Sequence, residues 1–166
     1  MYEQTRDGTQ ESVRTTVART SPTEMTATRL FDSPLRRVYE AWRNPALFRQ
    51  WWVPRSMNIE LQACEMDVRT GGQYRLRYAQ GFEFFGRYVE VIPDARIVWT
   101  NEEGGENGST TTVFFEAIDG RTRVVLSERY PSPEALEAAG LDCLDATHET
   151  FAQLAELVAK GNFDAE

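Results

Sequence analysis

Residues 29–54 read RLFDSPLRRVYEAWRNPALFRQWWVP and carry the clearest structural signal in the chain. A helix start is indicated at Ser33-Pro34, because a serine side chain caps free backbone N–H groups and proline suits the first helical position. Pro45 either ends this helix or begins another, and Pro54 breaks the helical pattern for good. The apolar residues that recur at helical spacing are Leu35, Val38, Tyr39 and Trp42. The stretch therefore predicts two short, consecutive helices.

Two adjacent tryptophans, Trp51 and Trp52, stand near the end of this stretch. Neighbouring side chains on a helix point about a quarter-turn apart, so the two rings cannot share one direction into a core. We expect one ring to pack into the core. The other should rim the mouth of a cavity or lie on the surface, on a loop that Pro54 stiffens.

Residues 23–31, TEMTATRLF, combine threonine with large apolar residues and predict a strand before the helices. The residues before them are polar and rich in Thr, Ser and Arg, and only Val13 and Val17 would support a short strand there. The expected division of the chain is a polar tail, one domain and a short C-terminal tail, over residues 1–22, 23–160 and 161–166.

The middle of the chain predicts a series of short strands. Residues 73–78 alternate most strictly, with Tyr74, Leu76 and Tyr78 on one face and polar residues on the other. Asp119-Gly120 is a hairpin signal between two further strand-like runs. This spacing favours one curved antiparallel sheet of about six to seven strands.

The C-terminal part changes to helical periodicity. Ser132 and Pro133 indicate the start of a short helix, which Gly140 is expected to interrupt. Residues 141–158 then predict a long amphipathic helix of about five turns, with His148 on its apolar face. The order of strand, helix pair, strand series and long helix indicates an α+β fold with the helices on one face of the sheet.

Five stretches, in this order, resemble the Hsp90-ATPase-activator-homologue C-terminal domain family. This family belongs to the START-like (SRPBCC, polyketide cyclase-like) helix-grip superfamily. Besides residues 29–54, the matching stretches are DVRTGGQYR (67–75), GRYVEVIPDARIVWT (86–100), TTTVFFE (110–116) and GRTRVVLSE (120–128). Each motif alone is short, but the ordered set covers most of the chain.

The resemblance implies a curved sheet that grips the long helix, with a pocket between them for apolar small molecules. The family has no invariant catalytic set, so it supplies no catalytic residue. One departure lies near the start of the long helix, where the family usually has a glycine followed by a large apolar residue. Here residues 140–151 read GLDCLDATHETF. Either Gly140-Leu141 is a displaced version of that motif, or Ala146 and Thr147 occupy its place.

Aromatic residues of the strands and helices are the candidates for the walls of this pocket. Aromatic walls with few polar groups suit a small-molecule cavity, although a domain of this size also needs aromatic residues for its core. The candidate ligand-binding residues are Trp51, Trp52, Tyr74, Tyr78, Phe84, Tyr88, Trp99, Phe114, His148 and Phe151.

No residue stands out as a catalyst. His148, the only histidine, either orients a ligand or moves a proton in the pocket, or it bonds to the sheet at the edge of the core. Glu90 is either half of a structural salt bridge or a proton acceptor. Ser, His and Asp occur without a GxSxG motif, and a metal site lacks a second histidine. We therefore assign no catalytic residue, no metal ion and no cofactor.

Composition narrows the class of protein further. The 166 residues carry a formal net charge of -8, which disfavours binding to nucleic-acid phosphates. Cys64 and Cys143 lie far apart and form no CxxC, so neither a zinc site nor a disulfide framework is expected. Apolar runs are too short for a membrane span or a signal peptide. We expect a cytoplasmic protein, a monomer or homodimer, without nucleic-acid or membrane partners.

The expected function is binding of a small apolar or aromatic molecule between the sheet and the C-terminal helix, without covalent catalysis. The resemblance implies two alternatives. One is an accessory or stress-response role beside an Hsp90-type chaperone, although a one-domain chain has no room for the second domain of an Hsp90 activator. The other is a cyclase or dehydratase that acts on a polyketide-like or aromatic substrate, with His148, Glu90 and the tyrosines as its acid–base groups.

Overall fold

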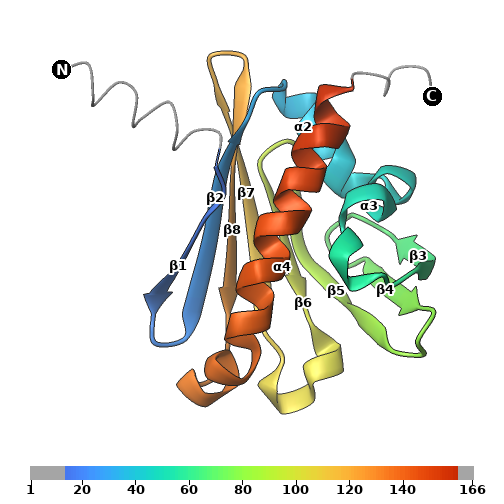
Figure 1. Ribbon diagram of the computed structural model, residues 1–166, viewed down its shortest axis with the longest axis vertical. Coiled ribbons are helices and arrows are strands. Elements are labelled where there is room, and N and C mark those ends of the chain that lie inside the picture. The colour runs from blue at the N-terminus through green and yellow to red at the C-terminus, as the bar shows by residue number, and fades with distance from the viewer. Residues whose placement is uncertain (1–13, 161–166) are drawn as a thin grey trace.

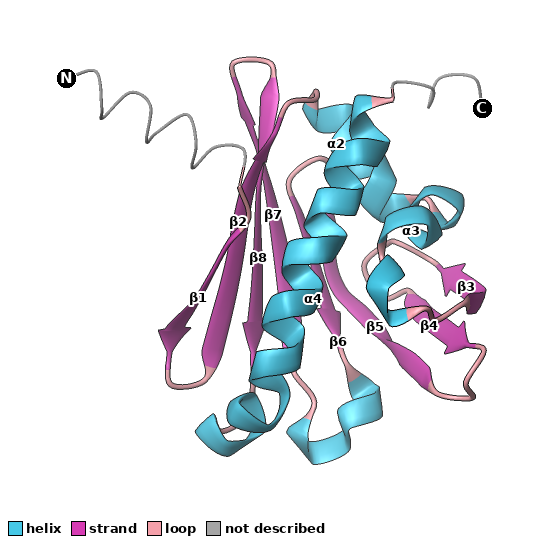
Figure 2. Ribbon diagram, in the orientation of Figure 1, coloured by secondary structure: helices cyan, strands magenta, loops and turns pink. Residues whose placement is uncertain are grey.

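The fold is α+β, with one eight-stranded antiparallel sheet curved around the C-terminal helix (Figures 1 and 2). The computed structural model describes residues 14–160, apart from the side chains of 140–145. The strands are β1 (Thr16–Ser21), β2 (Glu24–Phe31), β3 (Leu61–Met66), β4 (Gln73–Tyr78), β5 (Glu83–Ile92), β6 (Arg96–Thr100), β7 (Thr110–Ile118) and β8 (Arg121–Arg129). They lie side by side in the order β1-β2-β8-β7-β6-β5-β4-β3.

The sheet has more strands than expected because residues 16–21 form an edge strand. β1 pairs antiparallel with β2, from Thr16 opposite Thr28 to Ser21 opposite Glu24, and Val17 packs against the core. The sequence analysis had placed these residues in the polar tail. The other side chains of β1 are mostly exposed, as suits an edge strand with one open side, and this explains their polar composition.

The two short helices are present as predicted: α2 (Leu35–Arg43) and α3 (Pro45–Trp51). The predicted cap at Ser33 is wrong, because the helix makes no side-chain cap bond there. Instead, the buried Ser33 hydroxyl donates to the carbonyl oxygen of Val158 at 3.3 Å. Short 3₁₀ segments, η1 (Arg55–Met57) and η2 (Glu102–Asn107), follow α3 and β6.

Helix α4 (Pro133–Ala159) runs without interruption across the concave face of the sheet. Ser132 caps it by accepting a hydrogen bond from the N–H of Ala135 at 3.1 Å, as predicted. The expected break at Gly140 is wrong. A glycine inside a helix costs only about 1 kcal/mol relative to alanine, which the surrounding turns and packing can offset. None of the helices in residues 14–160 has the length and apolar character that a bilayer crossing requires.

The core is an aromatic cluster between the helices and the sheet, centred on Trp42. The Trp42 ring lies 4.7 Å from that of Trp51, 5.8 Å from that of Phe115 on β7 and 6.1 Å from that of Phe151 on α4, between ring centroids. All four side chains are buried. One residue of α2 therefore joins both other helices to the sheet.

Gly86 on β5 allows two backbone segments to approach each other closely. It pairs with Tyr74 on β4, whose hydroxyl donates to the carbonyl oxygen of Thr100 at 2.7 Å. A Cβ atom at Gly86 would lie 2.0 Å from that same oxygen. Because the obstacle is backbone, no side-chain rotation can relieve the clash.

We therefore predict that Gly86→Ala lowers the free energy of unfolding by about 1–3 kcal/mol, the usual cost of overpacking. The matched control is Gly104→Ala, since a Cβ atom at Gly104 meets nothing within 4 Å. Its effect should stay within about 0.5 kcal/mol. Urea denaturation measures both, and equal stability of the two variants would contradict the steric argument.

Candidate functional site

A cavity of about 470 Å³, here called the outer cavity, lies between α4 and the concave side of the sheet. Its walls come from the loop after α3, the β4–β5 hairpin, η2, β8 and the middle of α4. The partly exposed Met57, Phe82 and Phe84 belong to this lining, so the cavity reaches the surface there. Its principal apolar lining residues are Trp52, Ile59, Tyr78, Phe84, Leu126 and Phe151.

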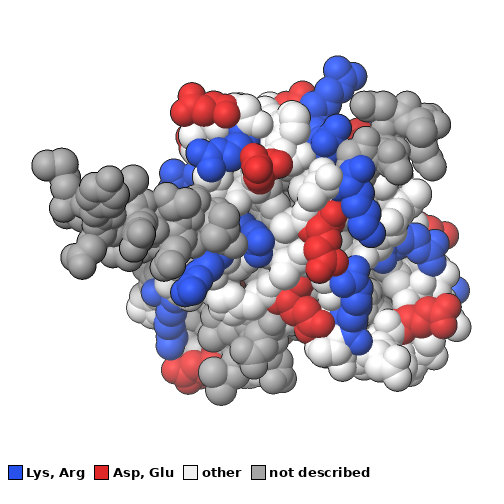
Figure 3. All heavy atoms as spheres, turned by 45° about the horizontal axis from the view of Figure 1, so that its top comes forward, with Lys and Arg blue, Asp and Glu red and all other residues white. Residues whose placement is uncertain are grey.

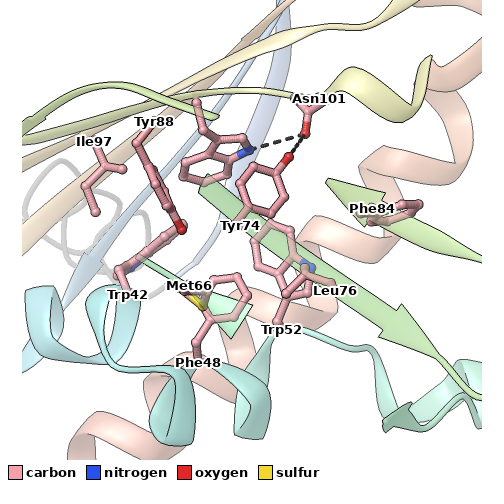
Figure 4. Close-up of a pocket in the computed structure, with 11 residues that line it drawn as sticks. Trp42, Phe48, Trp52, Met66, Tyr74, Leu76, Phe84, Tyr88, Ile97 and Asn101 are labelled. Atoms are coloured by element: carbon pink, nitrogen blue, oxygen red, sulfur yellow. Dashed lines mark hydrogen bonds between the residues drawn. The ribbon is translucent and has the colours of Figure 1, made fainter. Parts of the chain in front are cut away.

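A second space of about 30 Å³, here called the inner chamber, adjoins the outer cavity. Trp52, Phe84 and Asn101 line both spaces. Figure 4 shows the side chains around the inner chamber, which come from α2, α3 and strands β3 to β6. The remaining lining residues are Trp42, Phe48, Met66, Tyr74, Leu76, Tyr88, Ile97 and Trp99.

Seven of the ten candidate residues line these two spaces. The two adjacent tryptophans point in different directions, as expected. Trp51 is fully buried in the core, where its Nε1–H donates to the carbonyl oxygen of Ala41 at 2.9 Å. Trp52 lines both spaces. The other candidates that line the outer cavity, the inner chamber or both are Tyr74, Tyr78, Phe84, Tyr88, Trp99 and Phe151.

Phe114 and His148 point away from the cavity, so their predicted orientations are wrong. Phe114 is 42% exposed on the outer face of β7, with the Arg96 guanidinium 5.8 Å from its ring, and Phe115 is the buried neighbour. Strand side chains alternate between faces, so an error of one residue exchanges inside and outside. His148 is exposed because each helical step turns the side chain by about 100°, and Thr147 and Phe151 are the residues that face the cavity.

Glu90, the other candidate acid–base group, lies outside both linings. It forms a salt bridge with Arg96, with 2.7 Å between the carboxylate oxygen and the guanidinium nitrogen. Among the described side chains, those of residues 14–139 and 146–160, no three His, Cys, Asp or Glu groups come together as a metal site would require.

Asn101 is a polar wall residue that the sequence analysis missed. Its Oδ1 accepts hydrogen bonds from the hydroxyl of Tyr74 and the Nε1–H of Trp99, both at 3.2 Å (Figure 4). Its Nδ2 donates to the hydroxyls of Ser109 and Thr111, both at 2.9 Å. Asn101 thus fixes the orientation of two aromatic side chains that line the inner chamber.

Two carboxyl groups, Glu103 of η2 and Glu128 of β8, also line the outer cavity and were missed. Burial raises the pKa of Glu128 above its ordinary value, and the charge of Glu103 adds to this effect. A hydrogen bond from Tyr130 lowers the pKa but does not cancel the increase. The Tyr130 hydroxyl lies 2.8 Å from Glu128 Oε2. Burial also raises the pKa of Glu103, which accepts a hydrogen bond from the backbone N–H of Phe85 at 3.0 Å.

The lining tyrosines are neutral hydrogen-bonding groups. Burial raises the pKa of Tyr78 to about 12 and raises the pKa of Tyr74 and of Tyr88 well above the ordinary value. Their hydroxyls therefore keep their protons near neutral pH. They suit orientation of a ligand rather than proton abstraction.

Trp42, one of the residues that line the inner chamber, carries an unpaired donor. Its Nε1–H is buried and has no acceptor within the described part of the chain. A buried donor without a partner costs about 1–3 kcal/mol.

A clasp from α4 holds the loop that carries Trp52. The buried Gln153 side chain donates from Nε2 to the carbonyl oxygens of Trp51 and Val53, both at 2.9 Å. Its Oε1 accepts from the N–H of Arg55 at 2.9 Å. The Trp52 ring is further stacked on Phe48, with 4.7 Å between centroids. This wall of the cavity is therefore fixed before any ligand arrives.

The raised pKa of Glu128 predicts a pH-dependent effect of Glu128→Gln. The folded protein binds this proton more tightly than the unfolded chain, so the contribution of Glu128 to stability falls as pH rises above about 4.5 until the folded-state pKa is passed. The glutamine variant lacks this loss. Its free energy of unfolding relative to wild type should therefore increase from pH 4 to pH 8, as measured by urea denaturation.

Glu102→Gln is the matched control for this experiment, with the opposite sign. Hydrogen bonds from Thr100 and Arg87 lower the pKa of Glu102, so its carboxylate adds stability above its ordinary pKa. The stability of this variant relative to wild type should fall over the same pH range. Parallel pH profiles for Glu128→Gln and wild type would contradict the assignment of Glu128.

Solved structures with this fold come from several bacteria. A protein from Rhodobacter sphaeroides superposes with a TM-score of 0.78 at 21% sequence identity, over 89% of this chain and 99% of that one. A Nitrosomonas europaea protein gives 0.76 at 19% identity, over 86% and 98%. One from Mycobacterium smegmatis gives 0.68 at 22% identity, over 88% and 98%. At these identities the likeness establishes the fold alone.

The sequence itself gives the family. No curated protein is a significant match to it. The family model described as "Activator of Hsp90 ATPase homolog 1-like protein" matches residues 32–159, from the end of β2 to the last residue of α4. This range contains both helices of the opening motif and every wall of the two spaces. The chain belongs to the Activator of Hsp90 ATPase homolog 1-like family.

Proposed function

We propose that the chain binds one small molecule with a largely apolar or aromatic body in the joined outer cavity and inner chamber, without covalent catalysis. The observation that carries this proposal is the outer cavity of about 470 Å³, lined mainly by aromatic and aliphatic side chains. Ligand sites usually have this volume range and this kind of wall, with a few fixed polar groups. Here Asn101 and the neutral tyrosines provide such groups.

A further observation supports binding over a purely structural gap. The wall residue Trp52 is held in place by the Gln153 clasp and by its stacking on Phe48, so the site is largely preformed.

The two alternatives from the resemblance remain predictions. For a cyclase or dehydratase, the expected acid–base groups His148 and Glu90 do not reach the cavity. For a chaperone-accessory role, the family name is the only support. The cytoplasmic location and the oligomeric state also remain predictions.

The charges on the face that Figure 3 presents fit a small-molecule partner better than a nucleic acid. On the face that Figure 3 presents, Lys and Arg are interspersed with Asp and Glu and form no continuous basic patch. Several basic side chains of the described part pair directly with acidic ones, as in Arg55 with Glu156 and Arg43 with Glu40.

Binding can be tested with N-phenyl-1-naphthylamine, a neutral dye that fluoresces in apolar sites. We expect saturable binding at one site. Trp52→Ala should weaken it at least about tenfold, because a large aromatic wall is removed. Ala146→Trp should block it by filling the cavity, which Ala146 lines. Native mass spectrometry of freshly purified protein then shows whether a natural ligand co-purifies.

Phe114→Ala is the matched control, because Phe114 is an aromatic residue on the outer face of the sheet. It should leave dye binding unchanged. Each variant is checked for an intact thermal transition before titration, so that loss of fold is not read as loss of the site. Unsaturable dye binding, or equal losses in Trp52→Ala and Phe114→Ala, would contradict the proposal.

A further inference from the structure

The charges that line the outer cavity are of one sign. Its described lining contains the carboxyl groups of Glu103 and Glu128 but no Lys, Arg or His. The described lining of the inner chamber contains no Lys, Arg or His either. Residues 140–145 of α4, whose side chains are not described, read GLDCLD and contain no basic residue. The described lining therefore holds two acidic groups and no residue to neutralise them.

These two carboxyl groups differ from their neighbours along the chain. Glu102 pairs with Arg87 at 3.0 Å, and Arg129 pairs with Glu24 at 3.5 Å. Among residues 14–160, Glu103 and Glu128 have no cation within 4.0 Å. Side chains alternate along β8, so Arg129 points outward and Glu128 points inward. The Arg129 guanidinium therefore lies on the opposite face of the sheet from the Glu128 carboxyl group.

The hydrogen bonds that these carboxyl groups accept leave most of their oxygen lone pairs free. Glu128 accepts one bond from the Tyr130 hydroxyl, and Glu103 accepts one from the N–H of Phe85. A carboxylate has about four acceptor positions. The charge of Glu103 also acts on Glu128, where it disfavours the ionised form. A positive charge in the cavity near these two groups would offset this repulsion and use the free acceptor positions.

Aromatic rings near the same end of the cavity add to this preference. The Tyr78 ring stacks on Phe82 with 4.7 Å between centroids, and it meets Phe84 edge-on at 5.3 Å. The three rings and Trp52 all line the outer cavity. The faces of aromatic rings attract cations, and a ring cluster beside carboxylates is a known way to hold an organic ammonium group.

We propose that the ligand of this site is an organic cation, with a protonated or quaternary nitrogen beside Glu103 and Glu128 and an apolar or aromatic body against Trp52. This inference rests on the proposed function and names its ligand class.

Three naphthalene compounds of matched size test this proposal: 1-naphthylmethylamine, which is protonated at pH 7, neutral 1-naphthalenemethanol, and anionic 1-naphthoate. Titration calorimetry of the full chain should show the amine bound at least about tenfold more tightly than the alcohol, as a charge-assisted hydrogen bond allows. The carboxylate should bind most weakly, since it meets two like charges.

Variants then assign the effect to the two carboxyl groups. Glu103→Gln and Glu128→Gln should each weaken amine binding about tenfold and leave alcohol binding unchanged. Glu102→Gln removes the same charge from the outer face and should change neither. Glu103 lies in an exposed segment, so its variant tests the inference even where Glu128→Gln does not fold.

The outcomes separate this inference from the proposed function. Equal affinities of the amine and the alcohol in the wild type, or a preference for the amine that both glutamine variants retain, would overturn the organic-cation inference and leave small-molecule binding intact. If none of the three compounds nor the neutral dye binds, the proposed function fails and the inference fails with it.

Discussion

The packing of Trp42 among rings from every layer is the contact on which this structure depends. Its indole touches Trp51 of α3, Phe115 of the sheet and Phe151 of α4, so the helix pair, the sheet and the long helix meet at one side chain. Aromatic pairs in such edge-on arrangements contribute about 0.5–1.5 kcal/mol each beyond the area that they bury. Hydrogen bonds then fix the ends of α4: Ser132 caps its start, and the Ser33 hydroxyl donates to a carbonyl oxygen of its last turn.

Two groups of buried side chains hold the described part of α4 around the outer cavity. Toward its C-terminal end the helix buries Phe151, Leu154 and Val158 against the core. A small cluster of Tyr130, Ala135 and Leu136 packs near the start of the helix. Between these two groups, the small side chains of Ala146 and Thr147 line the outer cavity.

How far the sequence predicts this structure depends on the kind of signal at each residue. The helix pair, the antiparallel sheet and the aromatic inward face of β4 follow from periodicity, because Tyr74, Leu76 and Tyr78 alternate with polar residues. For β1 the sequence offered only Val17 as support for a short strand, and its polar neighbours favoured a tail, because an edge strand needs few apolar residues. Where two apolar residues are adjacent, as at Phe114 and Phe115, periodicity does not tell which side chain faces the core. The tertiary contacts of β7 decide that Phe115 is the buried one.

The polar part of the site was the least predictable. Glu128 lies two residues after Leu126 on β8, so strand alternation does place it on the inward face, but a lone glutamate at a strand end usually faces water. Asn101 and Glu103 lie in a turn with no periodicity at all. Their positions arise from long-range contacts with Tyr74, Thr111 and Phe85, which no local pattern in the sequence encodes.

The tryptophan cluster also has an optical consequence. The chain has four tryptophans, and the rings of Trp42, Trp52 and Trp99 lie 6.2–6.4 Å apart, with Trp51 4.7 Å from Trp42. At such separations the indoles exchange excitation energy and couple their transitions, so they emit as one chromophore. Three of the four line the inner chamber. Tryptophan fluorescence of this protein therefore comes from one cluster, most of which forms the wall of the inner chamber, and the protein carries its own spectroscopic reporter of occupancy.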